Sequence, residues 1–455
     1  MSDDRTWGVL ASQSAEDALR SRINHDADSF HAEVAAREIH WQNPSSGAWL
    51  ARADGGPWRG WTVQGQDTHL EADAWTPWSD VLDQTAAPYY RWFVGGQTNA
   101  CFNLVDRHLL QGRADKTAII FEGDRWDPSK NEGRGGPVTE QHFSYRVLFE
   151  EIIARMRVLQ DLGLQTGDRI AFNLPNIPEQ VFYMLAAQRL GIVYTPVFGG
   201  FSAKTLSDRI HDAGAKLVIT ADGGYRNAEG VAYKGTYTDP ALDNYIPRET
   251  ALTTLKTVLE DYNLGSLADV LYDDVYASLE DEITLERSDV MRELGASLAQ
   301  QNTVAAELAA ELRTAVARQL ADAKHDVEHV IVVQYTGQEI VEHARDKLSD
   351  DLVAKAKDQI AKDLGLDTFE QLADDAPSAL WSKLNGVLPA VSVDANFPLF
   401  IIYTSGSTGK PKGVVHTHGS WLSGVSHTMR TVFNATHDDT LYVIGDPGWI
   451  TGQSY

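Results

Sequence analysis

Between residues 116 and 220, short apolar runs alternate with longer segments whose apolar residues recur at helical spacing. Short apolar runs predict buried strands, and apolar positions three and four apart predict helices packed on one face. The expected order is strand 117–122, helix 145–162, strand 169–174, helix 179–190, strand 192–198, helix 204–213 and strand 216–220. This alternation is typical of a parallel sheet and predicts a doubly wound α/β domain with functional loops at the strand ends.

The segment before this region has little sustained periodicity. Eight of the twelve tryptophans lie within the first 92 residues, among Gly, Pro and Asp. Because tryptophan is chiefly a packing residue with one hydrogen-bond donor, residues 1–105 are predicted to be an irregular segment packed on the body rather than a binding cage.

Residues 251–380 predict a mostly helical insertion around one core strand, 330–333. Seven apolar residues keep to one stripe at helical spacing: Leu294, Leu298, Ala305, Leu308, Leu312, Val316 and Leu320. The segment holds 27 Asp and Glu against 11 Lys and Arg, which is typical of a solvated outer face. The alternative interpretation, that this acidic face is a docking surface for another module, remains open. The expected division is therefore 1–105, 106–250 for the α/β repeats, 251–380, and 381–455.

Length, charge and cysteine content narrow the class of protein. A chain of 455 residues exceeds the roughly 250 to 300 residues of a single core, so at least two folding units are expected. The net charge of −25 disfavours nucleic-acid or anionic-membrane partners. Cys101 is the only cysteine, which excludes an internal disulfide and suits a reducing cytosol. With no secretory signal pattern and no apolar run near the ~18 residues of a membrane span, the sequence predicts a cytoplasmic globular protein.

The clearest chemical signal is a string rich in glycine and hydroxyl groups between two predicted strands, 400–404 and 414–416. It consists of Thr404, Ser405, Gly406, Ser407, Thr408, Gly409, Lys410, Pro411, Lys412 and Gly413. Glycines let backbone N–H groups turn toward one centre, hydroxyls donate, and lysines supply positive charge, a combination suited to phosphate. The spacing is not that of a Walker A loop, because Gly406 and Gly409 are three apart. The ordered string favours a phosphate loop over a flexible linker.

Two further features favour structural roles. His416 and His418 lie two apart after the string without a third ligand nearby, so no metal-binding residue is predicted. Cys101 has no recognisable base partner, so a buried, inert thiol is favoured over a nucleophile.

The string Thr404 to Gly413 resembles the signature phosphate loop of the AMP-forming acyl-CoA synthetases of the adenylate-forming superfamily. Segments 92–96, 106–108, 196–201, 218–226 and 446–455 are similar to the acetyl- and propionyl-CoA synthetase branch. The tryptophan-rich leader and the insertion look like the N-terminal 3-hydroxypropionate-CoA ligase module of the fusion enzyme propionyl-CoA synthase.

This resemblance implies a partial large N-terminal domain of the adenylate-forming fold. It also implies a reaction in which a carboxylate attacks the α-phosphate of ATP, pyrophosphate leaves, and CoA captures the acyl-adenylate. The implied substrates are a short acid, with 3-hydroxypropionate as the best match, together with ATP and CoA, and the implied metal is Mg²⁺. NADPH would serve only a reductase module beyond this segment. Because a carboxylate approaching a triphosphate is electrostatically uphill, the loop and above all Lys412 would neutralise charge as pyrophosphate leaves.

The resemblance assigns the remaining candidate residues. Trp449, Ile450 and Thr451 would line the acyl pocket, and Arg226, Gly200 and Thr451 would contact CoA. The family's second arginine, three residues after Arg226, is Glu229 here. This departure leaves a plain surface role for Arg226 open.

The family's motifs for adenine, ribose and Mg²⁺, and its C-terminal lysine, have no match before Tyr455. The segment is therefore expected to be part of a longer polypeptide with hydratase and reductase modules and to be inactive alone. A homodimer remains possible. Three alternative functions also remain: an ordinary acetyl- or propionyl-CoA synthetase, a domain that loads a carrier protein, and a non-catalytic docking module.

Overall fold

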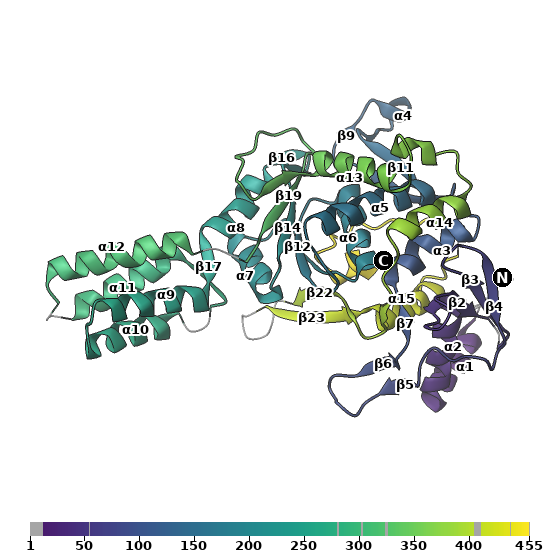
Figure 1. Ribbon diagram of the computed structural model, residues 1–455, viewed down its shortest axis with the longest axis horizontal. Coiled ribbons are helices and arrows are strands. Elements are labelled where there is room, and N and C mark those ends of the chain that lie inside the picture. The colour runs from purple at the N-terminus through teal and green to yellow at the C-terminus, as the bar shows by residue number, and fades with distance from the viewer. Residues whose placement is uncertain are drawn as a thin grey trace.

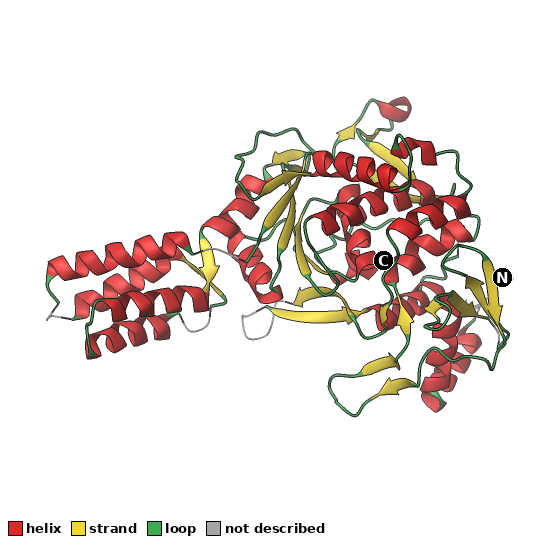
Figure 2. Ribbon diagram, in the orientation of Figure 1, coloured by secondary structure: helices red, strands yellow, loops and turns green. Residues whose placement is uncertain are grey.

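The computed structural model describes residues 12–53, 55–279, 282–301, 304–323, 326–404, 411–436 and 438–454. A seven-stranded sheet lies in the body (Figure 2). In spatial order its strands are β20 (Asp346–Leu348), β19 (His329–Val333), β14 (Leu217–Ala221), β12 (Arg169–Asn173), β13 (Val193–Pro196), β22 (Pro398–Thr404) and β23 (Lys412–Thr417). Neighbours from β20 to β22 are parallel, as predicted, whereas β23 is antiparallel to β22. Only residues 405–411 separate β22 from β23, too few for the crossover that a parallel pair requires.

Helices cover both faces of this sheet, which confirms the doubly wound α/β prediction. Successive side chains of a strand point to opposite faces. Ile170, Phe172, Ile219 and Ile331 accordingly share one core with helices α5 (Tyr145–Asp161), α6 (Pro178–Leu190) and α13 (Ser349–Asp363). Ala171, Val218, Val330 and Val332 share a second core with α7 (Ala203–Ala213) and α8 (Asp239–Asp243).

The helix ends follow from local sequence. Ser144 and Ser202 cap the N-termini of α5 and α7, each accepting from a backbone N–H three residues on. Gly191 and Gly214 end α6 and α7 in the left-handed region, with φ of 67° and 60°. Glycine adopts this conformation without a Cβ penalty, so both predicted helix stops are confirmed.

The N-terminal segment is more regular than expected. It contains helices α1 (Gln13–His25) and α2 (Ala27–Glu38), an antiparallel sheet of β1 (Trp41–Gln42), β2 (Trp49–Arg52), β3 (Trp58–Trp61) and β4 (Asp67–Leu70), and a hairpin of β5 (Asp80–Asp83) and β6 (Arg91–Val94). Trp41, Trp49 and Trp58 are buried, and Trp49 stacks on Phe102 with ring centroids 4.1 Å apart. Tryptophan therefore packs this segment, but in strands of two to four residues that show little periodicity.

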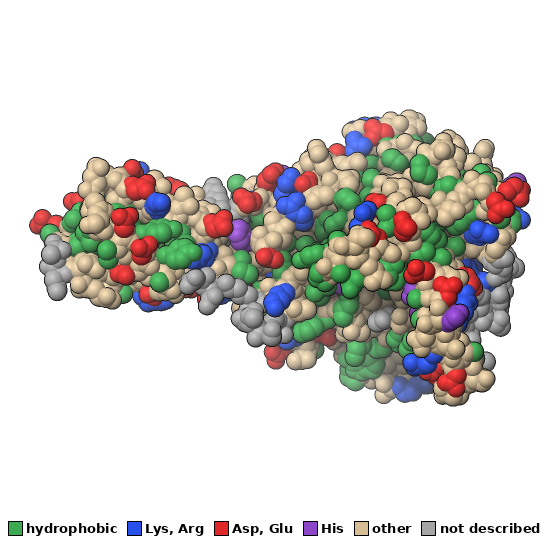
Figure 3. All heavy atoms as spheres, turned by 90° about the horizontal axis from the view of Figure 1, so that it is seen from below, with side chains coloured by type: hydrophobic (Ala, Val, Ile, Leu, Met, Phe, Trp, Pro, Cys, Tyr) green, Lys and Arg blue, Asp and Glu red, His purple; other side chains and the backbone are tan. Residues whose placement is uncertain are grey.

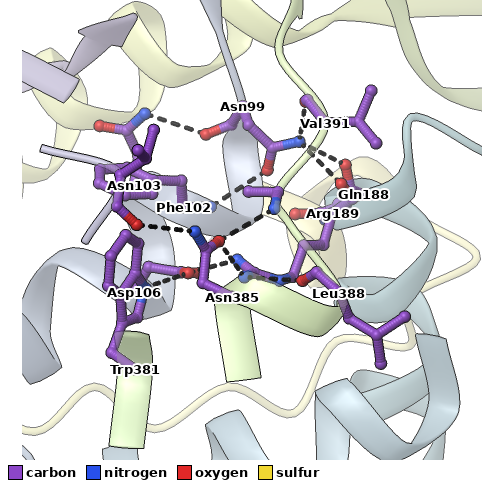
Figure 4. A network of polar contacts seen from close by, with 12 residues as sticks. Asn99, Phe102, Asn103, Asp106, Gln188, Arg189, Trp381, Asn385, Leu388 and Val391 are labelled. Carbon is purple, nitrogen blue, oxygen red and sulfur yellow. Dashed lines mark hydrogen bonds and ion pairs between the residues drawn. The ribbon is translucent and has the colours of Figure 1, made fainter. Parts of the chain in front are cut away.

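A buried polar network joins this segment to the body (Figure 4). The Asn99 amide donates to the backbone carbonyls of Gln188, 3.0 Å away, and Val391, 2.8 Å away. Asp106 ends the π-helical turn Phe102–Asp106, which runs into α3 (Arg107–Leu110). Its carboxylate pairs with Arg189 of α6 and accepts from the Trp381 indole of α14 (Pro377–Val387) at 2.7 Å.

One predicted strand lies outside the main sheet, which corrects the expected alternation. Strand β8 (Thr117–Glu122) pairs antiparallel with β11 (Glu140–Ser144) in a sheet of two strands. Between them lie the short pair β9 (Trp126–Asp127) and β10 (Gly136–Pro137) and the turn α4 (Lys130–Gly133). The chain therefore returns locally after β8 and does not cross over through a helix.

Four helices form a bundle that projects from the body (Figure 1). They are α9 (Arg248–Asp261), α10 (Ser266–Ser278), α11 (Arg287–Gln300) and α12 (Ala306–Asp322), at the end of a ribbon of β17 (Tyr245–Pro247) and β18 (Thr284–Glu286). The bundle has its own core, which includes Leu255, Leu294 and Leu312. It is shorter than the expected insertion of 251–380, because β19, β20, α13 and α14 belong to the body.

Candidate functional site

The turn after β13 and the segment 446–449 meet beyond the end of that strand. Residues 197–201 follow β13, and Gly448 of the segment 446–449 lies against them. A Cβ on Gly448 would lie 2.5 Å from the Phe198 backbone nitrogen, so only glycine fits there without displacement. The Trp449 ring lies 6.3 Å, centroid to centroid, from both Phe198 and Phe201. Three aromatic rings thus gather where the two turns meet.

Asp446 and Tyr233 were not predicted as site residues, although Asp446 begins the family-like segment 446–455. Burial raises the pKa of Asp446 to about 6, while hydrogen bonds from the Gly448 and Gly199 N–H groups act in the opposite direction. The Gly448 N–H donates to this carboxylate at 2.6 Å. A Cβ on Gly199 would overlap the Tyr233 hydroxyl, and burial raises the pKa of Tyr233 to about 12. These groups hold the two turns together.

The proposed acyl-pocket residues begin the short helix α16 (Ile450–Ser454). Trp449 is 54% exposed and Ile450 is 41% exposed. Thr451 is also exposed and makes no hydrogen bond to Arg226 or Gly200 among the described residues. The structure brings Trp449 to the aromatic cluster, whereas the pocket roles of all three residues stay predictions.

Arg226 and Gly200 do lie together. Arg226 ends β15 (Gly224–Arg226), which pairs with β16 (Glu229–Val231) and places Glu229 directly opposite it. A Cβ on Gly200 would lie 2.9 Å from Nη1 of Arg226, whose guanidinium is 5.7 Å from the Phe198 ring centroid. No ion pair joins Arg226 to Glu229 in the described part of the chain. The cation therefore remains available beside the turn.

The ends of the predicted phosphate loop are described, but its centre is not. Ser405, Gly406, Ser407, Thr408, Gly409 and Lys410 lie outside the described residues. Thr404 and Lys412 are direct partners at the ends of β22 and β23. Gly413 lies opposite Tyr403, and a Cβ there would lie 2.9 Å from Cγ2 of Ile401 and 3.3 Å from the Tyr403 ring. Packing in the strand pair thus favours glycine at 413.

The sequence also gives no sign of the polar side chains that contact Tyr403 near the end of β22. The Tyr403 hydroxyl donates to Asp212 of α7 at 2.6 Å. The Arg209 guanidinium lies 4.2 Å from the Phe201 ring centroid and 5.5 Å from that of Tyr403. Burial lowers the pKa of Arg209 to about 10. Arg209 and Asp212 are three apart and share a helix face, but nothing in the sequence points to Tyr403 as their partner.

The histidines and the cysteine are packed into the body. His418 starts α15 (His418–Thr431), and its Nδ1 accepts from the Ala100 N–H at 3.0 Å. Burial lowers the pKa of His418 to about 3, and His416 stacks on Phe400 with centroids 4.6 Å apart. Burial also raises the pKa of Cys101 well above its usual range. His418 and Cys101 are thus buried and neutral, and His416 is half-buried against Phe400, positions that fit structural roles.

Within the described ranges, one cluster has metal-ligand chemistry: Asp239, Asp243 and His343. Its carboxylates are already neutralised, because Lys234 pairs with Asp239 at 2.9 Å and Arg345 pairs with Asp243 at 2.8 Å. At the described loop ends, Thr404 offers a hydroxyl oxygen and Lys412 an ammonium, whereas Mg²⁺ is usually bound through carboxylates. Neither the cluster nor these two loop-end residues therefore forms a Mg²⁺ site.

Comparison with known proteins places this geometry in a class. The AMP-binding enzyme family matches residues 106–337 and 302–455, two overlapping stretches that together cover most of the chain. The acetyl-coenzyme A synthetase N-terminus family matches residues 68–104. The chain therefore belongs to the AMP-binding enzyme family and has the α/β fold of the adenylate-forming N-terminal domain.

Individual relatives agree with this class. The acetyl-coenzyme A synthetase of Mycobacterium tuberculosis (strain ATCC 25618 / H37Rv) is 31% identical over 386 residues, which cover 84% of this chain and 41% of the relative. That of Methylobacillus flagellatus is 32% identical over 443 residues, which cover 96% of this chain and 44% of the relative. The chain thus spans less than half the length of these relatives. None of the described helices combines the length and apolar character needed to cross a bilayer.

Proposed function

We propose that this chain forms the phosphate- and acyl-binding part of an AMP-forming acid–thiol ligase. The protein would activate a short carboxylic acid with ATP to an acyl-adenylate, release pyrophosphate, and pass the acyl group to CoA. One observation carries the proposal. The string from Thr404 to Gly413 is intact, and the strand that leads into it lies beside the turn that carries Gly200 and Phe201.

The chain's own residues would divide this work. Lys412, at the start of β23, would neutralise charge on the departing pyrophosphate. Arg226, next to Gly200, would bind CoA phosphates, and Glu229 opposite it would weaken that contact by repelling the same anion. Trp449 and Thr451 would line the acyl pocket, where the indole N–H and the hydroxyl can donate hydrogen bonds.

The finer assignment is 3-hydroxypropionate as the acid, within the ligase module of a larger cytoplasmic propionyl-CoA synthase. The resemblance of the leader and the bundle supports it. A site that donates to the substrate hydroxyl discriminates strongly against an acid that lacks it. The relatives' names, all acetyl-coenzyme A synthetase, favour the alternative of acetate or propionate.

Comparing four acids tests this assignment. The complete protein is assayed for AMP release with ATP, Mg²⁺ and CoA and with acetate, propionate, acrylate or 3-hydroxypropionate. We expect the highest kcat/KM for 3-hydroxypropionate. If acetate comes first, the chain belongs to an acetyl-CoA synthetase with an added bundle. If no acid supports AMP release, the ligase proposal fails and a docking role of the bundle gains support.

A further inference from the structure

Helix α7 brings two polar side chains to the strand that enters the phosphate loop. Arg209 and Asp212 are three residues apart, so they are neighbours on the helix surface. The Asp212 carboxylate accepts a hydrogen bond from the Tyr403 hydroxyl at 2.6 Å, and the Arg209 guanidinium lies over the ring of the same tyrosine. Tyr403 and Arg209 are only 7% and 6% exposed. Tyr403 is therefore fixed at both its ring and its hydroxyl.

Arg209 differs from the other interior arginines. Arg189 pairs with Asp106, and Arg155 pairs with Glu151. Arg209 has neither an ion pair nor a hydrogen bond to any described residue. Its Nε is buried without a partner, as it is in the other two, so the missing carboxylate is what sets Arg209 apart. A largely buried guanidinium without a carboxylate beside it is unfavourable for folding. The stacking on two rings offsets part of this penalty, so the position of Arg209 points to a role beyond stability.

That position connects the two halves of the site. Tyr403 directly precedes Thr404, and Thr404 is paired with Lys412 across β22 and β23. Arg209 also lies 4.2 Å from the ring centroid of Phe201, and the Phe201 and Trp449 ring centroids are 6.3 Å apart. One side chain thus contacts both the strand that leads to the phosphate loop and the turn beside the aromatic cluster.

We propose that Arg209 and Asp212 are positioning residues for Thr404 and Lys412, the described ends of the phosphate loop. By fixing Tyr403, they set the direction in which these two side chains face the phosphates of ATP. Small misplacements of binding groups reduce catalysis strongly, because reacting atoms must be held in near-attack geometry. The inference rests on the proposed ligase function.

The test removes single groups without opening a cavity. Tyr403→Phe removes only the hydroxyl, and Asp212→Asn removes only the charge of its acceptor. Tyr183→Phe is the matched control, since it removes a buried tyrosine hydroxyl that hydrogen-bonds Ser349 at 2.9 Å. Arg209→Met keeps the apolar stem, and Arg209→Lys restores a cation. In the complete protein, KM for ATP and for the acid is measured by carboxylate-dependent pyrophosphate exchange, beside a melting curve.

We expect Tyr403→Phe and Asp212→Asn to raise KM for ATP by about fivefold to tenfold, the size of one typical hydrogen bond. KM for the acid should not change, and the melting temperature should fall no more than in Tyr183→Phe. Arg209→Met should have the same effect on ATP, and Arg209→Lys should recover part of it.

Equal KM values for ATP in Tyr403→Phe and Tyr183→Phe would overturn the proposal. A wild-type protein without exchange for any acid would instead contradict the ligase function. Calorimetric affinity for MgATP then decides the positioning role: a fivefold to tenfold weakening only in the Tyr403, Asp212 and Arg209→Met variants, about one hydrogen bond, supports it. Affinities equal to those of the control overturn it.

Discussion

The buried pair of Asp106 and Arg189 makes a quantitative prediction. Both side chains are fully buried, and the carboxylate also accepts from the Trp381 indole at 2.7 Å. The guanidinium further donates to Asn385 at 2.9 Å. Asp106→Asn keeps the side-chain volume but leaves Arg189 as an uncompensated buried charge. Breaking a buried pair in this way costs about 3 to 5 kcal/mol of the free energy of unfolding.

An exposed pair of similar geometry serves as the control. Arg157 and Asp363 lie 2.7 Å apart near the surface, with side chains 20% and 30% exposed, so Asp363→Asn should cost much less than Asp106→Asn. Replacing both members of the buried pair, as Asp106→Leu with Arg189→Met, should cost less than Asp106→Asn alone, since no charge stays buried.

Denaturation by guanidinium chloride, followed by tryptophan fluorescence, measures the free energy of unfolding of the body. None of the twelve tryptophans lies in the bundle, residues 245–323, so its unfolding does not contribute directly. A loss for Asp106→Asn within about 1 kcal/mol of the loss for Asp363→Asn would refute the reasoning, because a buried and an exposed pair would then be equivalent.

Three further predictions concern the site. The pKa of Asp446 is raised from 3.8 to about 6, so the protonated form favours folding below pH 4 and this contribution is lost as pH rises through 6. The stability of Asp446→Asn relative to wild type should therefore increase from pH 4 to pH 7, by about 3 kcal/mol at most. Denaturation curves at the two pH values measure this increase, and a difference that does not change with pH contradicts it. Gly448→Ala places a Cβ 2.5 Å from the Phe198 nitrogen and should cost about 1 to 3 kcal/mol and raise KM for the acid, unlike Gly424→Ala, where nothing lies within 4 Å of the added carbon. Finally, the 455-residue chain alone should release no AMP with ATP, Mg²⁺, CoA and 3-hydroxypropionate, and measurable turnover would show that the site is misplaced.

The α/β repeats could be predicted because their signals are local. Apolar runs mark β12 and β14, and Gly191 and Gly214 mark helix ends at positions that require a positive φ. The N-terminal sheet could not be predicted, since its strands of two to four residues are too short for an alternating pattern. The pairing of β8 with β11 was hidden because an apolar run does not identify its partner.

The limits of the bundle were obscured by charge. It holds 15 Asp and Glu against six Lys and Arg between residues 245 and 323, and acidic residues continue through α13 in the body. In Figure 3 its acidic side chains are spread among basic and apolar ones. Because the composition is the same on both sides of the boundary, it does not show at which residue the bundle ends.

The candidate site was predictable only where a motif carried it. The string at 404–413, Arg226 and Trp449 could be found by resemblance, and Gly200 with Arg226 proved to be neighbours. Arg209 and Asp212 could not, because their partner Tyr403 is almost 200 positions away and only the fold brings it to α7.

Carboxylate-dependent exchange of pyrophosphate into ATP tests the central claim most directly, because it reports acyl-adenylate formation without CoA transfer. The complete protein is compared with Lys412→Ala and with Lys383→Ala, a control that removes an ion pair with Asp375 at the surface. We predict exchange that depends on a short acid in wild type and Lys383→Ala, and its loss in Lys412→Ala with an unchanged melting curve. Wild-type exchange in Lys412→Ala would contradict the account.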